Sequence, residues 1–213
     1  MTTQTTDLDR RTSVIDRYEE ARRYFMGEGI LNTALGPLTT DLEAHRIDYA
    51  VLGATALFAH GYERLTVDIN LLMTPAGLQS FHDELVGLGY APAFLGARKT
   101  LRSTTYGVSI DVVTTGEYPG DGKPKPVSMP EPLEASVEID GIRFVTLEKL
   151  IELKLASGIS AADRLKDLAD VQELIKIRKL DAGFAAKLDP FVQAKYLELE
   201  EAVRKSQSIQ QGE

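Results

Sequence analysis

Two β-prone runs in the middle of the chain carry polar residues inside an apolar frame, and this pattern restricts the fold more than any other. Residues 67–73 (VDINLLM) hold Asp68 and Asn70, and residues 108–114 hold Asp111. Residues two apart on a strand project to the same face, so Asp68 and Asn70 are expected side by side. A carboxylate inside a β run is costly unless it is paired or binds a cation. Two such strands as neighbours would build an oxygen-lined pocket suited to Mg²⁺.

Helical periodicity frames this strand-rich middle. Apolar residues recur at helical spacing over residues 14–25 and 30–46, with Gly36-Pro37 as the place where the second helix would break, and over 75–87, 146–158, 161–177 and 190–206. Further β-prone runs are 48–52 and 99–103, and the pair 135–139 and 142–145 is joined by Asp140-Gly141, a strong hairpin signal. This order predicts an α+β fold, a mixed β-sheet flanked by helices with helical N- and C-terminal segments. We expect one compact unit in three parts, residues 1–46, 47–145 and 146–213.

Composition excludes several classes of protein. The 213 residues contain no cysteine, which excludes a disulfide scaffold, a thiolate metal site and a thiol nucleophile. The formal net charge of −8 argues against broad, nonspecific nucleic-acid binding, because that requires a basic face. No apolar run is long enough for a membrane span, and the polar N-terminus lacks a secretory signal, so a cytoplasmic protein is expected.

The stretch 51–73, VLGATALFAHGYERLTVDINLLM, resembles the signature of the nucleotidyltransferase superfamily, in which a glycine turn precedes an Asp-x-Asp strand and a later strand supplies a third acid. Within it, HGYERLTVDINLL is similar to the small prokaryotic branch that includes AbiEii-type toxins and minimal nucleotidyltransferases. The stretch FVTLEKLIELKLASGISAADRLKDLADVQELI resembles the helical signature that follows the sheet in that branch. The resemblance therefore implies a nucleotidyltransferase-like core over residues 47–145.

The same resemblance implies roles for single residues. Gly53 would form the turn where the backbone approaches the nucleotide phosphates, and Lys154 would reach toward the site. Asp68, Asn70 and Asp111 would hold Mg²⁺ or Mn²⁺, with Asp68 and Asp111 catalytic and Asp111 placed to accept a proton from the attacking hydroxyl. The residues implied to bind nucleotide, together with the basic residues best placed to do so, are Gly53, Ala54, Thr55, Arg64, Arg98, Lys99 and Lys154.

Two positions depart from the family pattern. Ala54 stands where the family has Gly or Ser, which removes a hydroxyl contact to phosphate. Asn70 stands where the family has its second carboxylate, so a site built for three negative charges keeps two. An amide oxygen still coordinates a hard cation, but without formal charge. The lost charge is therefore expected to lower the rate of catalysis.

Several residues also have an ordinary structural interpretation. Asp68 alone fits a strand end, and Asp111 fits the solvated face of an edge strand. His60 fits a helix end that satisfies carbonyl groups better than it fits a catalytic base, and Arg64 fits a pair with Asp68 or Glu63. Lys154, Asp167 and Asp170 fit a snorkelling lysine and a solvated acidic face. Lys123 and Lys125, which like Arg98 and Lys99 are candidates for contact with phosphate or an acceptor, also fit a solvated loop.

The function implied is the Mg²⁺-dependent transfer of a nucleotide from a nucleoside triphosphate to a hydroxyl on RNA or protein. AbiEii-like relatives act as toxins beside a separate antitoxin, so the resemblance also implies an antitoxin partner. The alternative is a catalytically degenerate fold that binds a nucleotide or a partner protein without turnover, and Asn70 is the residue that supports it. A third interpretation, a helical interaction module, rests on the amphipathic terminal helices alone.

Overall fold

Seven strands form a single mixed sheet in the computed structural model, which describes residues 14–210. The strand order is β3-β4-β5-β2-β1-β7-β6, and β2–β5 and β1–β7 are the parallel pairs. The other neighbouring pairs are antiparallel. The strands are β1 (Tyr49–Leu52), β2 (Asp68–Met73), β3 (Tyr90–Pro92), β4 (Thr100–Ser103), β5 (Ser109–Thr114), β6 (Ser136–Ile139) and β7 (Ile142–Val145).

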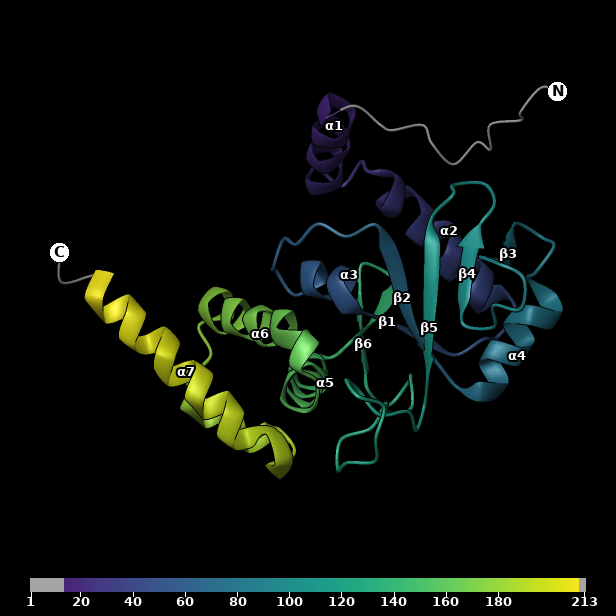
Figure 1. Cartoon of the computed structure of the whole chain (residues 1–213). Coiled ribbons are helices and arrows are strands. Elements are labelled where there is room, and N and C mark those ends of the chain that lie inside the picture. Colours follow the sequence, from purple (N-terminus) through teal and green to yellow (C-terminus); the bar gives the residue numbers. More distant parts are fainter. Residues whose placement is uncertain (1–13, 211–213) are drawn as a thin grey trace, which may run out of the picture.

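Helices lie on both sides of the sheet. Figure 1 shows α2 and α4 on one side and α3, α5 and α6 on the other, with α7 outside the α5–α6 pair. The helices are α1 (Val14–Phe25), α2 (Ile30–Ala44), α3 (Gly53–Ala59), α4 (Pro75–Glu84), α5 (Leu147–Ser160), α6 (Leu165–Arg178) and α7 (Pro190–Gln210), with 3₁₀ turns at Ala162–Arg164 and Ala182–Lys187. The α+β fold expected from the sequence is therefore confirmed. None of the helices within residues 14–210 is long and apolar enough to cross a membrane.

The two faces of the central strands differ in burial. Ile69 and Leu71 of β2 and Ile110 of β5 are almost completely buried, as the apolar frame of these runs predicts. Asn70 and Asp111, which alternate with them, are only partly buried. The alternation follows from the two-residue period of a strand, and it leaves one face of the sheet with polar groups in its centre.

Local signals in the sequence explain the ends of several elements. The β6–β7 hairpin turns at Asp140 and Gly141, both with positive φ, as expected for a two-residue loop. Thr74 accepts a hydrogen bond from the Gly77 N–H at 2.8 Å and caps α4, which opens on Pro75. Thr146 caps α5 in the same way through the Lys149 N–H.

Four boundaries differ from those expected. Helix α2 continues through Pro37, and α4 ends at Glu84, because the chain after it turns to form the short strand β3. The helix expected over residues 161–177 is split by the 3₁₀ turn at Ala162–Arg164. Helix α5 continues past Gly158 to Ser160, because Leu168 of α6 packs directly against residue 158. The glycine there allows two helices to approach and does not end one.

The loop that connects β5 to β6 packs against α5. Gly120 in this loop has a φ of +75°, and a Cβ added there would lie 2.3 Å from the Ser160 Oγ and 2.7 Å from the Ser157 carbonyl oxygen. Lys125 donates to the Pro119 carbonyl and to the Asp121 carboxylate, both at 2.6 Å, and so fixes the loop internally. The loop is therefore a rigid wall beside α5.

We predict that Gly120→Ala lowers the free energy of unfolding by about 2 to 5 kcal/mol, since a left-handed conformation for alanine and an overpacked contact each cost energy. Gly122→Ala is the matched control, because Gly122 has a φ of +71° and open space around its Cβ position. It should cost only about 1 to 2 kcal/mol. Urea unfolding of both variants measures the difference, and equal losses would mean that the loop does not press on α5.

Candidate functional site

The parallel register of β2 and β5 sets the position of the polar residues. Asn70 pairs with Asp111 across the two strands, and Asp68 pairs with Ser109. Register partners in a sheet project to the same face, so Asp68, Asn70 and Asp111 share one face. β5 is an inner strand, flanked by β2 and β4, and not the edge strand considered for Asp111. The i, i+2 spacing and the apolar frame are the sequence signals for this arrangement.

Both oxygens of Asp68 accept hydrogen bonds from neutral donors. The Thr66 hydroxyl donates to Oδ1, and the Asn70 side-chain amide donates from Nδ2 to Oδ2 at 2.9 Å. Within residues 14–210, no hydrogen bond or ion pair involves the Asp111 carboxylate. In the same residues no group of three His, Cys, Asp or Glu side chains is placed to hold a metal ion. The polar face thus offers two carboxylates and one amide.

The turn between β1 and α3 lies against Asn70. Gly53 has a φ of +68°, and a Cβ added there would lie 3.1 Å from both Cγ and Nδ2 of Asn70. Leu52, the last residue of β1, is the register partner of Asn70. Only glycine fits at residue 53 without displacing the Asn70 side chain, so the turn and the polar face form one surface.

A cavity of about 290 Å³ opens beside this surface. It lies between the sheet, α5 and the β5–β6 loop, and Asn70 forms part of its wall. Its other polar walls come from the loop, from α5 and from the start of α6. The residues lining it are Leu52, Gly53, Asn70, Val113, Glu117, Tyr118, Pro119, Gly120, Met129, Leu150, Leu153, Lys154, Ser157, Arg164 and Asp167.

A cluster of buried charges joins this cavity to the loop before β2. The Lys154 amine donates to Asp170 at 2.7 Å and to Asp167 at 2.9 Å, and Arg64 forms an ion pair with Asp170. The Ser157 hydroxyl donates to Asp167 at 2.7 Å. Asp170 is 2% exposed and Lys154 is 8% exposed. Two cations face two carboxylates, so the cluster has no net charge.

Asp167 shows how this pairing affects ionisation. Burial by itself would raise the pKa of the Asp167 carboxyl, but the positive charge of Lys154 and the hydrogen bonds from Ser157 and Lys154 outweigh it. The pKa of Asp167 is therefore lowered from its ordinary value. The carboxylate is held in its charged form, and it holds the Lys154 amine at the wall of the cavity.

The structure separates the predicted nucleotide-binding residues into groups. Gly53 and Lys154 line the cavity. Arg64 points into the buried cluster, and Lys99 forms an ion pair with the cavity residue Glu117. Arg98 is exposed, and the cavity wall does not include it.

Ala54 and Thr55, the other two predicted nucleotide-binding residues, lie away from the cavity beside Asn70. Both are buried on α3, and neither lines the cavity beside Asn70. Thr55 lines a different cavity, bounded by α1, α2 and the β6–β7 hairpin. The hydroxyl of Thr55 is therefore turned away from the polar face.

The remaining candidates have structural partners. His60 is buried and donates from Nε2 to the Val145 carbonyl at 2.8 Å. Burial lowers its pKa, although the hydrogen bond with Val145 acts in the opposite direction. Lys125 is held by its own loop, and Lys123 is exposed on that loop.

Sequence reasoning did not identify Arg164, Ser157 or Tyr118. Arg164 is exposed, lines the cavity, and has no ion-pair partner within residues 14–210. No local signal distinguishes it from the other charged residues of its segment, because its position depends on the 3₁₀ turn at Ala162–Arg164. Thr66, which donates to Asp68, was also missed, although its i, i+2 relation to Asp68 was visible in the sequence.

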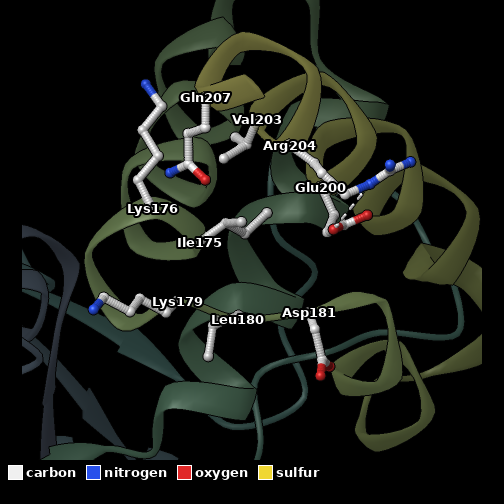
Figure 2. A pocket seen from close by; sticks show the side chains of 9 residues that line it. All are labelled: Ile175, Lys176, Lys179, Leu180, Asp181, Glu200, Val203, Arg204 and Gln207. Carbon is white, nitrogen blue, oxygen red and sulfur yellow. Dashed lines mark ion pairs between the residues drawn. The ribbon is translucent and has the colours of Figure 1, made fainter. Parts of the chain in front are cut away.

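A larger cavity of about 460 Å³ lies between α6 and α7 (Figure 2). Ile175, Leu180 and Val203 contribute apolar surface to its wall, and Glu200 forms an ion pair with Arg204 at 3.8 Å. Figure 2 shows the charged side chains of Lys176, Lys179, Asp181 and Arg204 pointing in different directions. They do not converge on one point, and the cavity shares no residue with the polar face.

No protein-family model matches the sequence, and no curated protein matches it. Several solved structures resemble the fold, among them the following three. ANT(2″)-Ia in complex with adenylyl-2″-tobramycin is 13% identical, with a TM-score of 0.47 over 83% of this chain and 97% of its own. An antigenic nucleotidyltransferase-like protein from Paracoccidioides brasiliensis is 15% identical, with a TM-score of 0.44 over 68% and 74%. JHP933 from Helicobacter pylori is 13% identical, with a TM-score of 0.41 over 83% and 94%. At these identities and scores, functional assignment rests on the side chains of this chain.

We predict that Asp167→Asn destabilises the protein only where the carboxylate is charged. The pKa of Asp167 is lower in the folded state than in the unfolded state. Its contribution to the free energy of unfolding is therefore present above the unfolded pKa and is lost as the pH falls through the folded pKa. At about pH 7 the substitution should cost about 1 to 3 kcal/mol, as expected for a hydrogen bond to a charged group. At about pH 3, which is below the unfolded pKa of about 3.9, the loss should be smaller, and it should vanish only once the pH is below the lowered folded pKa.

Denaturant unfolding at both pH values measures the effect. Asp163→Asn, at an exposed position four residues earlier, is the control and should change little at either pH. An Asp167→Asn loss that is the same in acid and at neutral pH would show that the charge of Asp167 does not stabilise the cluster.

Proposed function

We propose that the protein binds a nucleoside triphosphate in the cavity beside β2 and transfers its nucleotidyl group, in a Mg²⁺- or Mn²⁺-dependent reaction, to a hydroxyl on RNA or protein. The observation that carries the proposal is the parallel register that puts Asp68, Asn70 and Asp111 on one face. That face adjoins a glycine turn and a cavity whose wall holds Lys154 and Arg164 beside the carboxylates of Glu117 and Asp167. Nucleotidyl transfer requires this combination, because a polyanion must be held beside oxygen ligands for a divalent cation.

The donor set fits a hard divalent cation. Carboxylate oxygens of Asp68 and Asp111 and the amide oxygen of Asn70 are the ligands that Mg²⁺ takes in proteins. The amide now presents its nitrogen to Asp68, so it would have to turn over to present its oxygen. The bound ion would neutralise charge on the triphosphate.

The residues of the chain would supply the remaining chemistry. The Asp111 carboxylate has no partner among the described residues, so it is free to take the proton of the attacking hydroxyl. Arg164 would hold the phosphates, and the Gly53 turn would allow the backbone to approach them. Lys154, which is already paired with Asp167 and Asp170, would offer a hydrogen bond at the cavity wall but no free charge. The buried cluster around Asp170 would keep Lys154 in position.

A second candidate function is nucleotide binding without turnover. The Asn70 amide donates to Asp68, and Thr66 donates to the other oxygen, so Asp68 is satisfied by neutral groups. A metal site with one charge fewer binds a divalent ion less strongly. This observation favours a degenerate member of the fold that holds a nucleotide or a partner protein.

The biological setting is part of the same proposal. The resemblance to AbiEii-type toxins suggests a cytoplasmic toxin that is neutralised by a separate antitoxin protein. Transfer to a cellular RNA or protein would then be the toxic reaction. Growth of cells that express the native chain or Asp111→Asn tests this part, since only the native chain should arrest growth.

We predict that Asn70→Asp separates the two candidates. The variant brings a third carboxylate next to Asp68 and Asp111, and like charges repel unless a cation joins them. Without divalent ions it should therefore unfold at a lower temperature than the native chain. With millimolar Mg²⁺ it should gain more stability than the native chain, because binding to the folded state alone raises stability.

Thermal melts with and without Mg²⁺, and transfer assays with labelled triphosphates, distinguish the outcomes. Gln207→Glu on α7 is the control, because it adds the same charge at an exposed site away from the polar face. Transfer by the native chain supports an active enzyme, and transfer by Asn70→Asp alone supports a degenerate one. If neither form responds to Mg²⁺ or to triphosphate, both candidates fail.

We also predict that Arg164→Ala weakens triphosphate binding about 10- to 100-fold, as expected for the loss of a charge-assisted contact of about 1.5 to 3 kcal/mol. Lys166→Ala is the matched control, since Lys166 is exposed two residues away and does not line the cavity. Isothermal titration with a non-hydrolysable triphosphate measures both. Equal effects of the two substitutions would mean that only net charge matters.

A further inference from the structure

The cavity bounded by α1, α2, α3 and the β6–β7 hairpin has features of a second binding site. It measures about 370 Å³ and shares no lining residue with the cavity beside Asn70. This volume is within the range of small-molecule pockets. We propose that it binds a small aromatic amine that carries a second hydrogen-bonding group, independently of the nucleotide.

An unpartnered buried hydroxyl is the first observation. Thr55 is 7% exposed and lines the cavity, and its Oγ1 has no hydrogen-bond partner within residues 14–210. A buried polar atom without a partner costs free energy, so native proteins rarely retain one that no ligand or water satisfies. A ligand group that donates to this oxygen would remove the cost.

The wall of the cavity favours an aromatic ring. Tyr24, Phe58 and Phe144 contribute to it, and the rings of Tyr24 and Phe58 meet edge to face at 5.6 Å. Aromatic surfaces of this kind stack against rings and attract cations over their faces. The Tyr24 hydroxyl donates to the Arg64 carbonyl at 3.2 Å, and Asn32 donates to the Tyr24 carbonyl at 3.3 Å. These bonds hold the wall in place before a ligand enters.

The charge at the mouth of the cavity is negative. Asp140 is exposed on the β6–β7 turn, lines the cavity, and forms no ion pair with any residue in 14–210. Among the described residues, Asp140 is the only charged one that lines the cavity. A ligand ammonium group would therefore meet an uncompensated carboxylate there, whereas an anion would be repelled. The ring, the donor and the ammonium group together define the class of ligand.

Tyramine is the probe for this site, because it carries a ring, a phenolic hydroxyl and an ammonium group. Two related probes each lack one feature: 2-phenylethylamine has no hydroxyl, and 3-(4-hydroxyphenyl)propionate has a carboxylate in place of the amine. Titration of the ¹⁵N-labelled full chain should show saturable shifts at amides of α3 and of the β6–β7 turn with tyramine. The dissociation constant should be higher for 2-phenylethylamine and highest for the acid.

Two variants assign these differences to residues. Thr55→Val should raise the dissociation constant of tyramine about 3- to 10-fold and leave that of 2-phenylethylamine unchanged. Asp140→Asn should weaken both amines about 2- to 5-fold at low salt. Asparagine tolerates the positive φ of 52° at this turn, so the hairpin should persist. Glu138→Gln on the same hairpin is the control, because Glu138 does not line the cavity.

A stability measurement separates a binding role for Thr55 from a structural one. If the Thr55 hydroxyl forms a hydrogen bond only with a bound ligand, Thr55→Val removes an unsatisfied group from the free protein. The melting temperature of the free protein should then stay the same or rise. A fall in melting temperature with unchanged tyramine binding would overturn the proposal. So would shifts that do not saturate, or equal affinity for the amine and the acid.

Discussion

The arrangement of the site depends on the ion pairs that the buried carboxylate of Asp170 forms with Arg64 and Lys154. A charge that is 98% removed from solvent is tolerated only if it is paired and hydrogen-bonded. Its two partners come from different parts of the chain, Arg64 from the loop before β2 and Lys154 from α5. The Arg64–Asp170 and Lys154–Asp170 pairs form together, so the lengths of the arginine and lysine side chains set how far α6 lies from the loop before β2 and from α5. The cavity beside Asn70 is the space that this spacing leaves.

This pairing also decides which cations are available to a ligand. Six basic residues were candidates from the sequence for contact with phosphate or an acceptor, but Arg64, Lys99, Lys125 and Lys154 each have carboxylate partners. Arg164 is different, because it lines the cavity and no carboxylate in the described part of the chain pairs with it. Arg164, on a 3₁₀ turn, is therefore the cation of the cavity wall that lies outside these ion pairs, although its charge also lowers the pKa of Asp167 on the same wall. A count of basic residues near a motif does not predict this, because neutral pairs contribute little at a distance.

The sequence predicted features that depend on neighbours along the chain and missed those that depend on distant partners. The shared face of Asp68 and Asn70 follows from a two-residue period, and the β6–β7 turn follows from Asp140-Gly141. The partner of Arg64 is 106 residues away, and no local pattern encodes it. The direction of Thr55 depends on how α3 packs between two cavities. Strand β3 is short and was missed because it holds only three residues, Tyr90–Pro92.

Asn70 affects both the stability of the polar face without a cation and its affinity for one. With an amide at this position, Asp68 is satisfied without a cation, since it accepts from both Thr66 and Asn70. Three carboxylates in the same place would repel one another and would require a cation for stability. To coordinate an ion, the amide must turn and give up a hydrogen bond to a charged group, which costs about 1.5 to 3 kcal/mol. By itself this cost weakens cation binding about 10- to 100-fold. Asparagine in place of a carboxylate at residue 70 therefore gives a face that folds without a metal ion but binds one less strongly. A bound triphosphate, which supplies its own oxygen ligands to the ion, would have to compensate for the weaker binding.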